Sequence, residues 1–129
     1  MDYFAVLAKI MPAPMAGKGA GLLNALTPPD RQWVQTKARA LARSGVSNSV
    51  SLQSEIGQRF CSKDQWLSAQ QAIINAIYCA VLLEAMVELS GPTLDQGVIA
   101  RRSQLSDTLG KIMERYDASA KNVIQSMRG

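Results

Sequence analysis

Two glutamates, Glu84 and Glu88, are the residues whose type and spacing come nearest to a catalytic or metal-binding pair. Because they stand four residues apart, they share one face of a helix, and paired carboxylates bind metal ions in helix bundles. The Glu-x-x-His partner of such sites is missing, since the 129-residue chain contains no histidine. We therefore interpret the pair as a solvated or arginine-paired end of a helix, facing Arg101 or Arg102.

The lack of histidine also excludes Ser-His and Cys-His nucleophiles and the usual zinc and non-haem iron ligand sets. Two cysteines are too few for a structural zinc site or a disulfide framework, so reduced thiols are expected at Cys61 and Cys79, with Cys79 in the core. The glycine-rich stretch 16–21 lacks the spacing of a phosphate loop and is interpreted as a flexible turn. The sequence thus predicts no enzyme activity, no cofactor and no catalytic, cofactor-binding or metal-binding residues.

A basic stripe lies along the helix that is predicted for residues 28–43. Its members are Arg31, Gln35, Arg39 and Arg43, which follow one another at intervals of four, with Lys37 off to the side. Such a row could neutralise phosphates or an acidic protein surface, in keeping with the net charge of +4. An ordinary solvated helix face has the same pattern.

Residues 113–125 have the spacing of a helix-turn-helix motif. Asp117 stands where the turn usually has glycine, Val123 would pack the second helix, and Lys121 would face DNA. Met113 replaces the usual alanine, and one continuous amphipathic helix explains the same residues. The motif is therefore an alternative hypothesis for this segment.

These segments must be held by a scaffold, and its predicted centre is an apolar helix over residues 63–89. Between Ala72 and Leu83, Asn75 and the Tyr78 hydroxyl supply the only polar side-chain groups. A helix that is apolar all round is buried on all sides or against a partner. Its longest apolar run is about 12 residues, against the ~20 that a bilayer requires, so we expect no membrane insertion.

The sequence predicts a predominantly α-helical fold, with residues 1–129 forming a single domain around the central helix. Residues 12–29, rich in proline and glycine, are predicted to be a connector within it. Further helices are expected over 28–43 and 104–127. The stripe predicted to be buried on the 28–43 helix consists of Val34, Ala38 and Leu41. The alternative is a small α/β domain with short strands near 3–9, 46–52 and 78–87.

Two or three flanking helices would cover so apolar a central helix poorly, which favours a twofold homodimer. The residues expected at the dimer interface are Leu82, Met86, Ile112, Tyr116 and Val123. Together with the missing catalytic groups, this predicts a non-enzymatic protein-interaction or assembly factor, or a small adaptor, with itself and another protein as partners. It would act in the cytoplasm, or in a virion if it serves a viral rather than a secretion assembly.

The alternative function is nucleic-acid binding through the segment 113–125, the basic stripe, or both. The residues expected to contact nucleic acid or an acidic partner are Arg31, Lys37, Arg39, Arg43 and Lys121.

Overall fold

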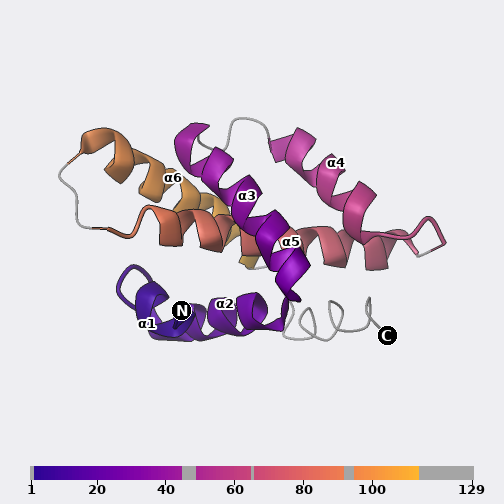
Figure 1. The fold of residues 1–129 in the computed structure, drawn as a ribbon, viewed down its shortest axis with the longest axis horizontal. Helices are drawn as coiled ribbons and strands as arrows, with labels where there is room; N and C mark the ends of the chain where they lie inside the picture. The colour runs from indigo at the N-terminus through magenta and orange to yellow at the C-terminus, as the bar shows by residue number, and fades with distance from the viewer. Residues whose placement is uncertain (1, 45–48, 65, 92–94, 114–129) are drawn as a thin grey trace.

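The computed structural model describes residues 2–44, 49–64, 66–91 and 95–113, most of which lie in helices. In chain order the helices are α1 (Tyr3–Leu7), α2 (Ala13–Ala25), α3 (Pro28–Ser44), α4 (Ser49–Phe60), α5 (Leu67–Glu88) and α6 (Gln96–Met113). The predicted α-helical fold is confirmed (Figure 1).

The alternative α/β fold is wrong, because the structure contains no strand within the residues it describes. Of the segment 3–9, residues 3–7 lie in α1 and residues 8 and 9 form a turn, whereas all of 78–87 lies in α5. Of the segment 46–52, residues 49–52 are helical and 46–48 lie outside the described residues. The alternation of Val50 and Leu52 that imitated a strand places Leu52 in the core and leaves Val50 exposed on α4.

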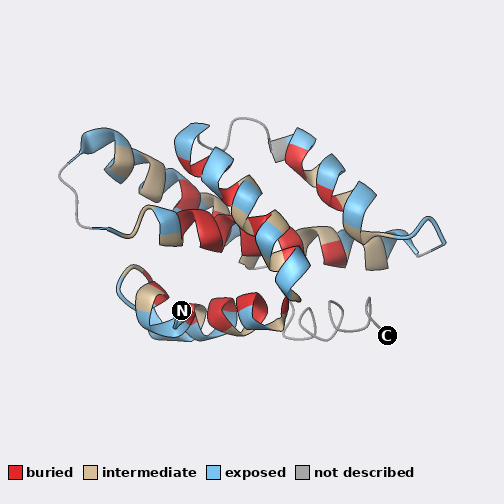
Figure 2. Ribbon diagram, viewed as in Figure 1, coloured by how far each residue is buried: buried red, intermediate tan, exposed pale blue. Residues whose placement is uncertain are grey.

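Helix α5 is the centre of the structure, and each of the other five described helices contacts it (Figure 1). Helices α1 and α2 lie along one side of α5, whereas α3, α4 and α6 lie along the other. Every residue from 76 to 86 is buried, and Figure 2 shows this burial as a continuous central stretch. The predicted central helix is thus confirmed, with observed ends at Leu67 and Glu88.

The segment predicted as a connector, 12–29, is largely helical, because Ala13–Ala25 form α2. Pro12 occupies the N-cap and Pro14 the first turn, where a missing amide proton breaks no helical hydrogen bond. Gly19 allows close packing, since a Cβ atom there would lie 2.8 Å from Leu83 and 3.2 Å from Leu7. The stretch 16–21 is therefore part of a packed helix, and its interpretation as a flexible turn was wrong.

Helices α3 and α6 bury the faces that their sequences indicate. Val34, Ala38 and Leu41 are all buried, as predicted for the 28–43 helix. On α6, Leu105 and Leu109 enter the core. This helix begins at Gln96, eight residues before the predicted start at 104, and the rest of its predicted range, 114–127, lies outside the described residues.

Two arginines on α6 bind the carboxyl ends of two neighbouring helices. Arg101 donates hydrogen bonds to the backbone oxygens of Ala42 (3.1 Å) and Arg43 (2.9 Å), at the end of α3. Arg102 donates to the backbone oxygens of Leu89 and Gly91, just past α5. The last carbonyls of a helix lack partners inside the helix and carry partial negative charge, so both arginines stabilise the packing of α6.

Candidate interaction surface

The glutamate pair is divided between the interior and the surface. Glu84 is 4% exposed, and its carboxylate accepts a hydrogen bond from the Tyr3 hydroxyl. Glu88 is at the surface and pairs with Arg39, with 3.5 Å between Oε1 and Nε. The arginine-paired interpretation fits Glu88, but the solvated one is wrong for Glu84. The expected partners, Arg101 and Arg102, instead bind backbone carbonyls.

The cluster around Glu84 joins α1, α3 and α5. Gln35 donates a hydrogen bond of 3.5 Å to the Tyr3 hydroxyl. Burial, followed by the neighbouring charge of Glu88, raises the pKa of Glu84, although the bonds from Tyr3 and Gln35 and the charge of Arg31 oppose it. Burial and the contact with Glu84 raise the pKa of Tyr3 to about 12. This buried cluster links three helices, and none of its residues lines the groove or the hollow described below.

The cations of the basic stripe are engaged by groups of the protein itself. Lys37 pairs with Glu55 of α4 at 3.2 Å, and Arg39 pairs with Glu88. Arg43 donates to the backbone oxygen of Arg39 within α3. Two of the four predicted cations are thus neutralised by acids that lie far away in the sequence.

Arg31 points toward the interior rather than toward a ligand. Its guanidinium donates to the backbone oxygens of Leu23 (3.3 Å) and Leu26 (3.1 Å), at the end of α2. Its Nε is buried and has no hydrogen-bond partner among the described residues. Lys121, the fifth predicted contact, lies outside the described residues, as does most of the helix-turn-helix candidate 113–125.

Trp33 holds two cations beside the basic stripe. The Nζ of Lys37 lies 5.5 Å from the centre of the indole ring, and the guanidinium carbon of Arg59 lies 5.6 Å from it. Arg59 also pairs with the buried carboxylate of Asp30 at 3.4 Å. An open polar hollow of about 450 Å³ lies here, but Glu55 and Asp30 already neutralise its cations.

Two residues that were expected at a dimer interface are buried within a single chain. Leu82 has no exposed surface and Met86 is 3% exposed. Ile112 is half-buried against the core. Tyr116 and Val123 lie outside the described residues. The central helix is therefore covered by five helices of its own chain, and its hydropathy gives no argument for a dimer.

The helix α5 is long and apolar enough to cross a membrane when judged by length and composition. Within the protein, 67% of its most apolar 18-residue window is buried. A central core helix has this composition, so packing accounts for the hydropathy. Among the described residues, no group of three or more acidic or cysteine side chains is placed to hold a metal ion. Cys61 and Cys79 are both free thiols, and Cys79 is in the core, as predicted.

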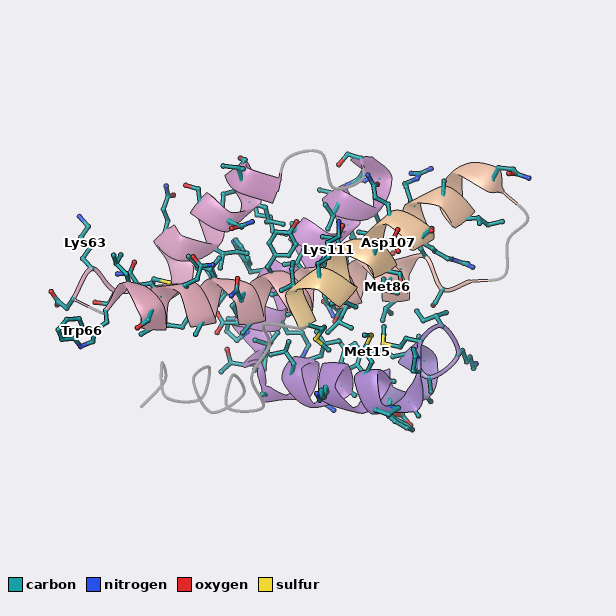
Figure 3. The ribbon with its side chains drawn as sticks, turned by 180° about the vertical axis from the view of Figure 1, so that it is seen from behind. Met15, Lys63, Trp66, Met86, Asp107 and Lys111 are labelled. Atoms are coloured by element: carbon teal, nitrogen blue, oxygen red, sulfur yellow. The ribbon has the colours of Figure 1, made fainter. Side chains whose placement is uncertain are left out.

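The most exposed apolar surface of the described residues is at the start of α5. Trp66 and Leu67 are adjacent, and each is 83% exposed. We call this pair the Trp66–Leu67 tip. Figure 3 shows Trp66 extending from the end of the molecule, near Lys63.

The backbone beneath the tip is held in place by hydrogen bonds. The Gln70 side chain donates to the backbone oxygen of Ser62 at 3.0 Å. The thiol of Cys61 lies 3.6 Å from the backbone oxygen of Gln70, and the Asp64 amide donates to the Ser62 hydroxyl at 3.3 Å. Cys61 and Ser62, just past α4, are thus tied to Gln70 in the first turn of α5.

An apolar groove of about 460 Å³ lies between the start of α2 and the end of α6. The residues that line it are Pro12, Pro14, Met15, Lys18, Gly110 and Met113. We call it the α2/α6 groove. Together with the Trp66–Leu67 tip, it gives the described surface one apolar projection and one apolar hollow.

Sequence reasoning missed both features. Trp66 was placed inside the predicted helix 63–89, where an exposed position could not be distinguished from a buried one. A prediction that the helix begins after Trp66 would have placed this tryptophan at the N-cap. A side chain at the N-cap lies beyond the packed turns of the helix, so the tip would then have been expected. The groove was missed because 12–29 was predicted to be a connector. Comparisons of the chain with protein-family models, with curated proteins and with solved structures find no significant match.

Proposed function

We propose that this chain is a non-enzymatic protein-interaction or assembly factor that binds its partner through the Trp66–Leu67 tip. The observation that supports this proposal is the exposure of the tip, at 83% for each of two adjacent large apolar side chains. Tryptophan is enriched among the residues that dominate binding energy at protein interfaces. Water is a poor environment for both side chains, so a partner that covers them gains the free energy of apolar burial.

The position of Trp66 also departs from what helix stability favours. Trp66 occupies the N-cap of α5 and makes no side-chain capping hydrogen bond. Serine, threonine, aspartate or asparagine at an N-cap stabilises a helix by about 1 kcal/mol over residues that cannot cap. Departures from local stability rules are concentrated at functional sites, which fits a binding role for this residue.

Nucleic-acid binding has less support. The stripe that suggested it is largely engaged by Glu55, Glu88 and backbone oxygens. Binding to phosphates would therefore have to break existing ion pairs and hydrogen bonds. Each phosphate contact would then contribute less to the free energy of binding.

Affinity capture with a tip variant tests the proposed function. Tagged chain is incubated with lysate of the source organism and, separately, with an untagged copy of itself. Trp66→Ser removes the indole and supplies an N-cap hydroxyl, so the fold is preserved while bound protein is lost. Val50→Ser is the matched control, because Val50 is 81% exposed but stands on α4, away from the tip. Undiminished capture by Trp66→Ser would show that the tip is not the binding anchor.

A further inference from the structure

The α2/α6 groove has the chemistry to receive a tryptophan and a leucine. Its volume of about 460 Å³ falls within the range of sites that enclose drug-sized molecules. Met15 and Met113 line it, and their flexible thioether chains adapt to an aromatic ring. Gly110 leaves depth in its floor, since a Cβ atom built there meets nothing within 4 Å.

One exposed charge at the groove and one beside the tip are opposite in sign. Lys18 lines the groove and is exposed, so its ammonium group can lie over an inserted indole ring. Asp64 is exposed two residues before Trp66 and can pair with the same lysine.

The tip and the groove of one chain do not meet. Figure 3 shows Trp66 at one end of the molecule and Met15 well away from it, beyond the middle. Because a projection can only shorten a distance, the two residues are at least as far apart in space as they appear in the picture. A tip that inserts into this groove would therefore have to come from another chain. If each copy inserts its tip into the other's groove, the two contacts are related by a twofold axis and the assembly closes as a dimer.

We propose that the α2/α6 groove binds the Trp66–Leu67 tip of a second copy of this chain. The proposal rests on the proposed function, because it takes the tip as the binding anchor, and it goes further by assigning the receptor surface and the partner. The hydrogen bond from Gln70 to Ser62 ties the backbone before the tip to the first turn of α5, which reduces the entropy that is lost when the tip is inserted.

A mixing experiment with two variants tests the proposal. Trp66→Ser removes the tip and keeps the groove, whereas Gly110→Leu fills the groove and keeps the tip. Gly110→Ala is the matched control, because its small side chain leaves most of the groove open. Molar mass is measured by size-exclusion chromatography with light scattering over a dilution series, and association of labelled chains gives the dissociation constant.

We expect wild type and Gly110→Ala to dimerise and each of the other variants to associate at least ~10-fold more weakly. An equimolar mixture of Trp66→Ser and Gly110→Leu should associate more strongly than either variant alone, because the mixed pair keeps one of the two tip–groove contacts. Circular dichroism should show folded helices in both, since serine caps α5 and leucine replaces a helix-interior glycine.

Three outcomes would overturn the proposal. If wild type is monomeric at every concentration, a second copy is not the occupant of the groove. If Gly110→Leu dimerises as well as wild type, the groove is not the receptor, although loss of association in Trp66→Ser would leave the proposed function standing. If the mixture associates no more strongly than either variant alone, although both variants are folded, the tip and groove do not bind each other. Lysate proteins captured through Trp66 in any of these cases would identify a different partner.

Discussion

The hydroxyl of Tyr3 in α1 donates a hydrogen bond to the carboxylate of Glu84 in α5, across 81 residues of sequence. Both residues are buried, at 4% exposure each. A carboxylate in the interior is unfavourable unless its oxygens are hydrogen-bonded, and Tyr3 supplies that bond. The short helix α1 is therefore attached to the central helix by a polar contact as well as by the apolar packing of Leu7.

Replacing Glu84 by glutamine should stabilise the protein near neutral pH, by about 1 kcal/mol. The amide oxygen still accepts the bond from Tyr3, and no charge is buried. Because burial raises the pKa of Glu84, the folded wild type binds more protons than the unfolded chain at pH values between the two pKa values. The contribution of Glu84 to wild-type stability therefore rises as pH falls from the folded-state pKa to the unfolded-state pKa. Over the same range, the stability advantage of Glu84→Gln over wild type becomes smaller.

Urea unfolding of both proteins from about pH 7 to about pH 4 measures this difference. Glu88→Gln is the control, since Glu88 lies on the same helix with its side chain 47% exposed and should change stability little at any pH. An advantage of Glu84→Gln that does not vary with pH would contradict the assignment of a raised pKa to Glu84.

Tyr3→Phe should lower the free energy of unfolding by about 1–3 kcal/mol, because the Glu84 carboxylate loses a buried donor. The pKa of Tyr3 is raised from 10.0 to about 12, so the folded protein retains a proton that the unfolded chain releases between these values. Wild-type stability from this group is present below about pH 10 and is lost as pH rises toward 12. Because burial also raises the pKa of Cys79 to about 12, both proteins should lose stability at alkaline pH, and wild type should lose more than Tyr3→Phe. Equal losses in unfolding curves of the two proteins would refute the raised pKa of Tyr3.

Gly19→Ala should destabilise the protein by about 1 kcal/mol, because the clash of the added methyl group with Leu83 and Leu7 exceeds the gain in helix propensity. Both leucines are fully buried and have little room to move. Gly21→Ala, on the same helix, meets nothing within 4 Å and should instead stabilise by about 0.5–1 kcal/mol. Thermal unfolding by circular dichroism distinguishes the two, and equal midpoints would argue against close packing at Gly19.

Arg102→Met should destabilise the protein by about 1–3 kcal/mol, because the carbonyls of Leu89 and Gly91 lose their charged donor while the apolar stem is kept. Arg39→Met is the matched control, since the pair with Glu88 is about half exposed and worth about 0–1 kcal/mol. Urea unfolding at two salt concentrations compares them. Similar small losses in both variants would mean that Arg102 does not cap α5.

The fold class could be predicted because it depends on local windows of sequence. The apolar segment around α5 and the spacing of Val34, Ala38 and Leu41 on α3 predicted their helices from periodicity and composition alone. The same kind of evidence wrongly predicted a connector where α2 lies, because glycines and prolines are typical of connectors. Whether Gly19 belongs to a loop or to a close helix contact depends on Leu83, which is remote in the sequence.

The candidate site depended on contacts that local patterns do not contain. Sequence spacing put Glu84 and Glu88 on one helix face, but α1 covers the first and leaves the second at the surface. The expected dimer residues Leu82 and Met86 were recognised as apolar, yet only the count of helices packed on α5 showed that their own chain buries them.

The amino-acid sequence by itself determined that this protein is helical, that it lacks histidine chemistry, and that an apolar helix forms its centre. The tertiary structure decided which charges are neutralised, which apolar side chains remain exposed at Trp66 and Leu67, and where a groove opens between α2 and α6. The physical reason is that helix formation follows from interactions within a few residues, whereas burial and charge pairing are set by elements that meet only after the chain has folded.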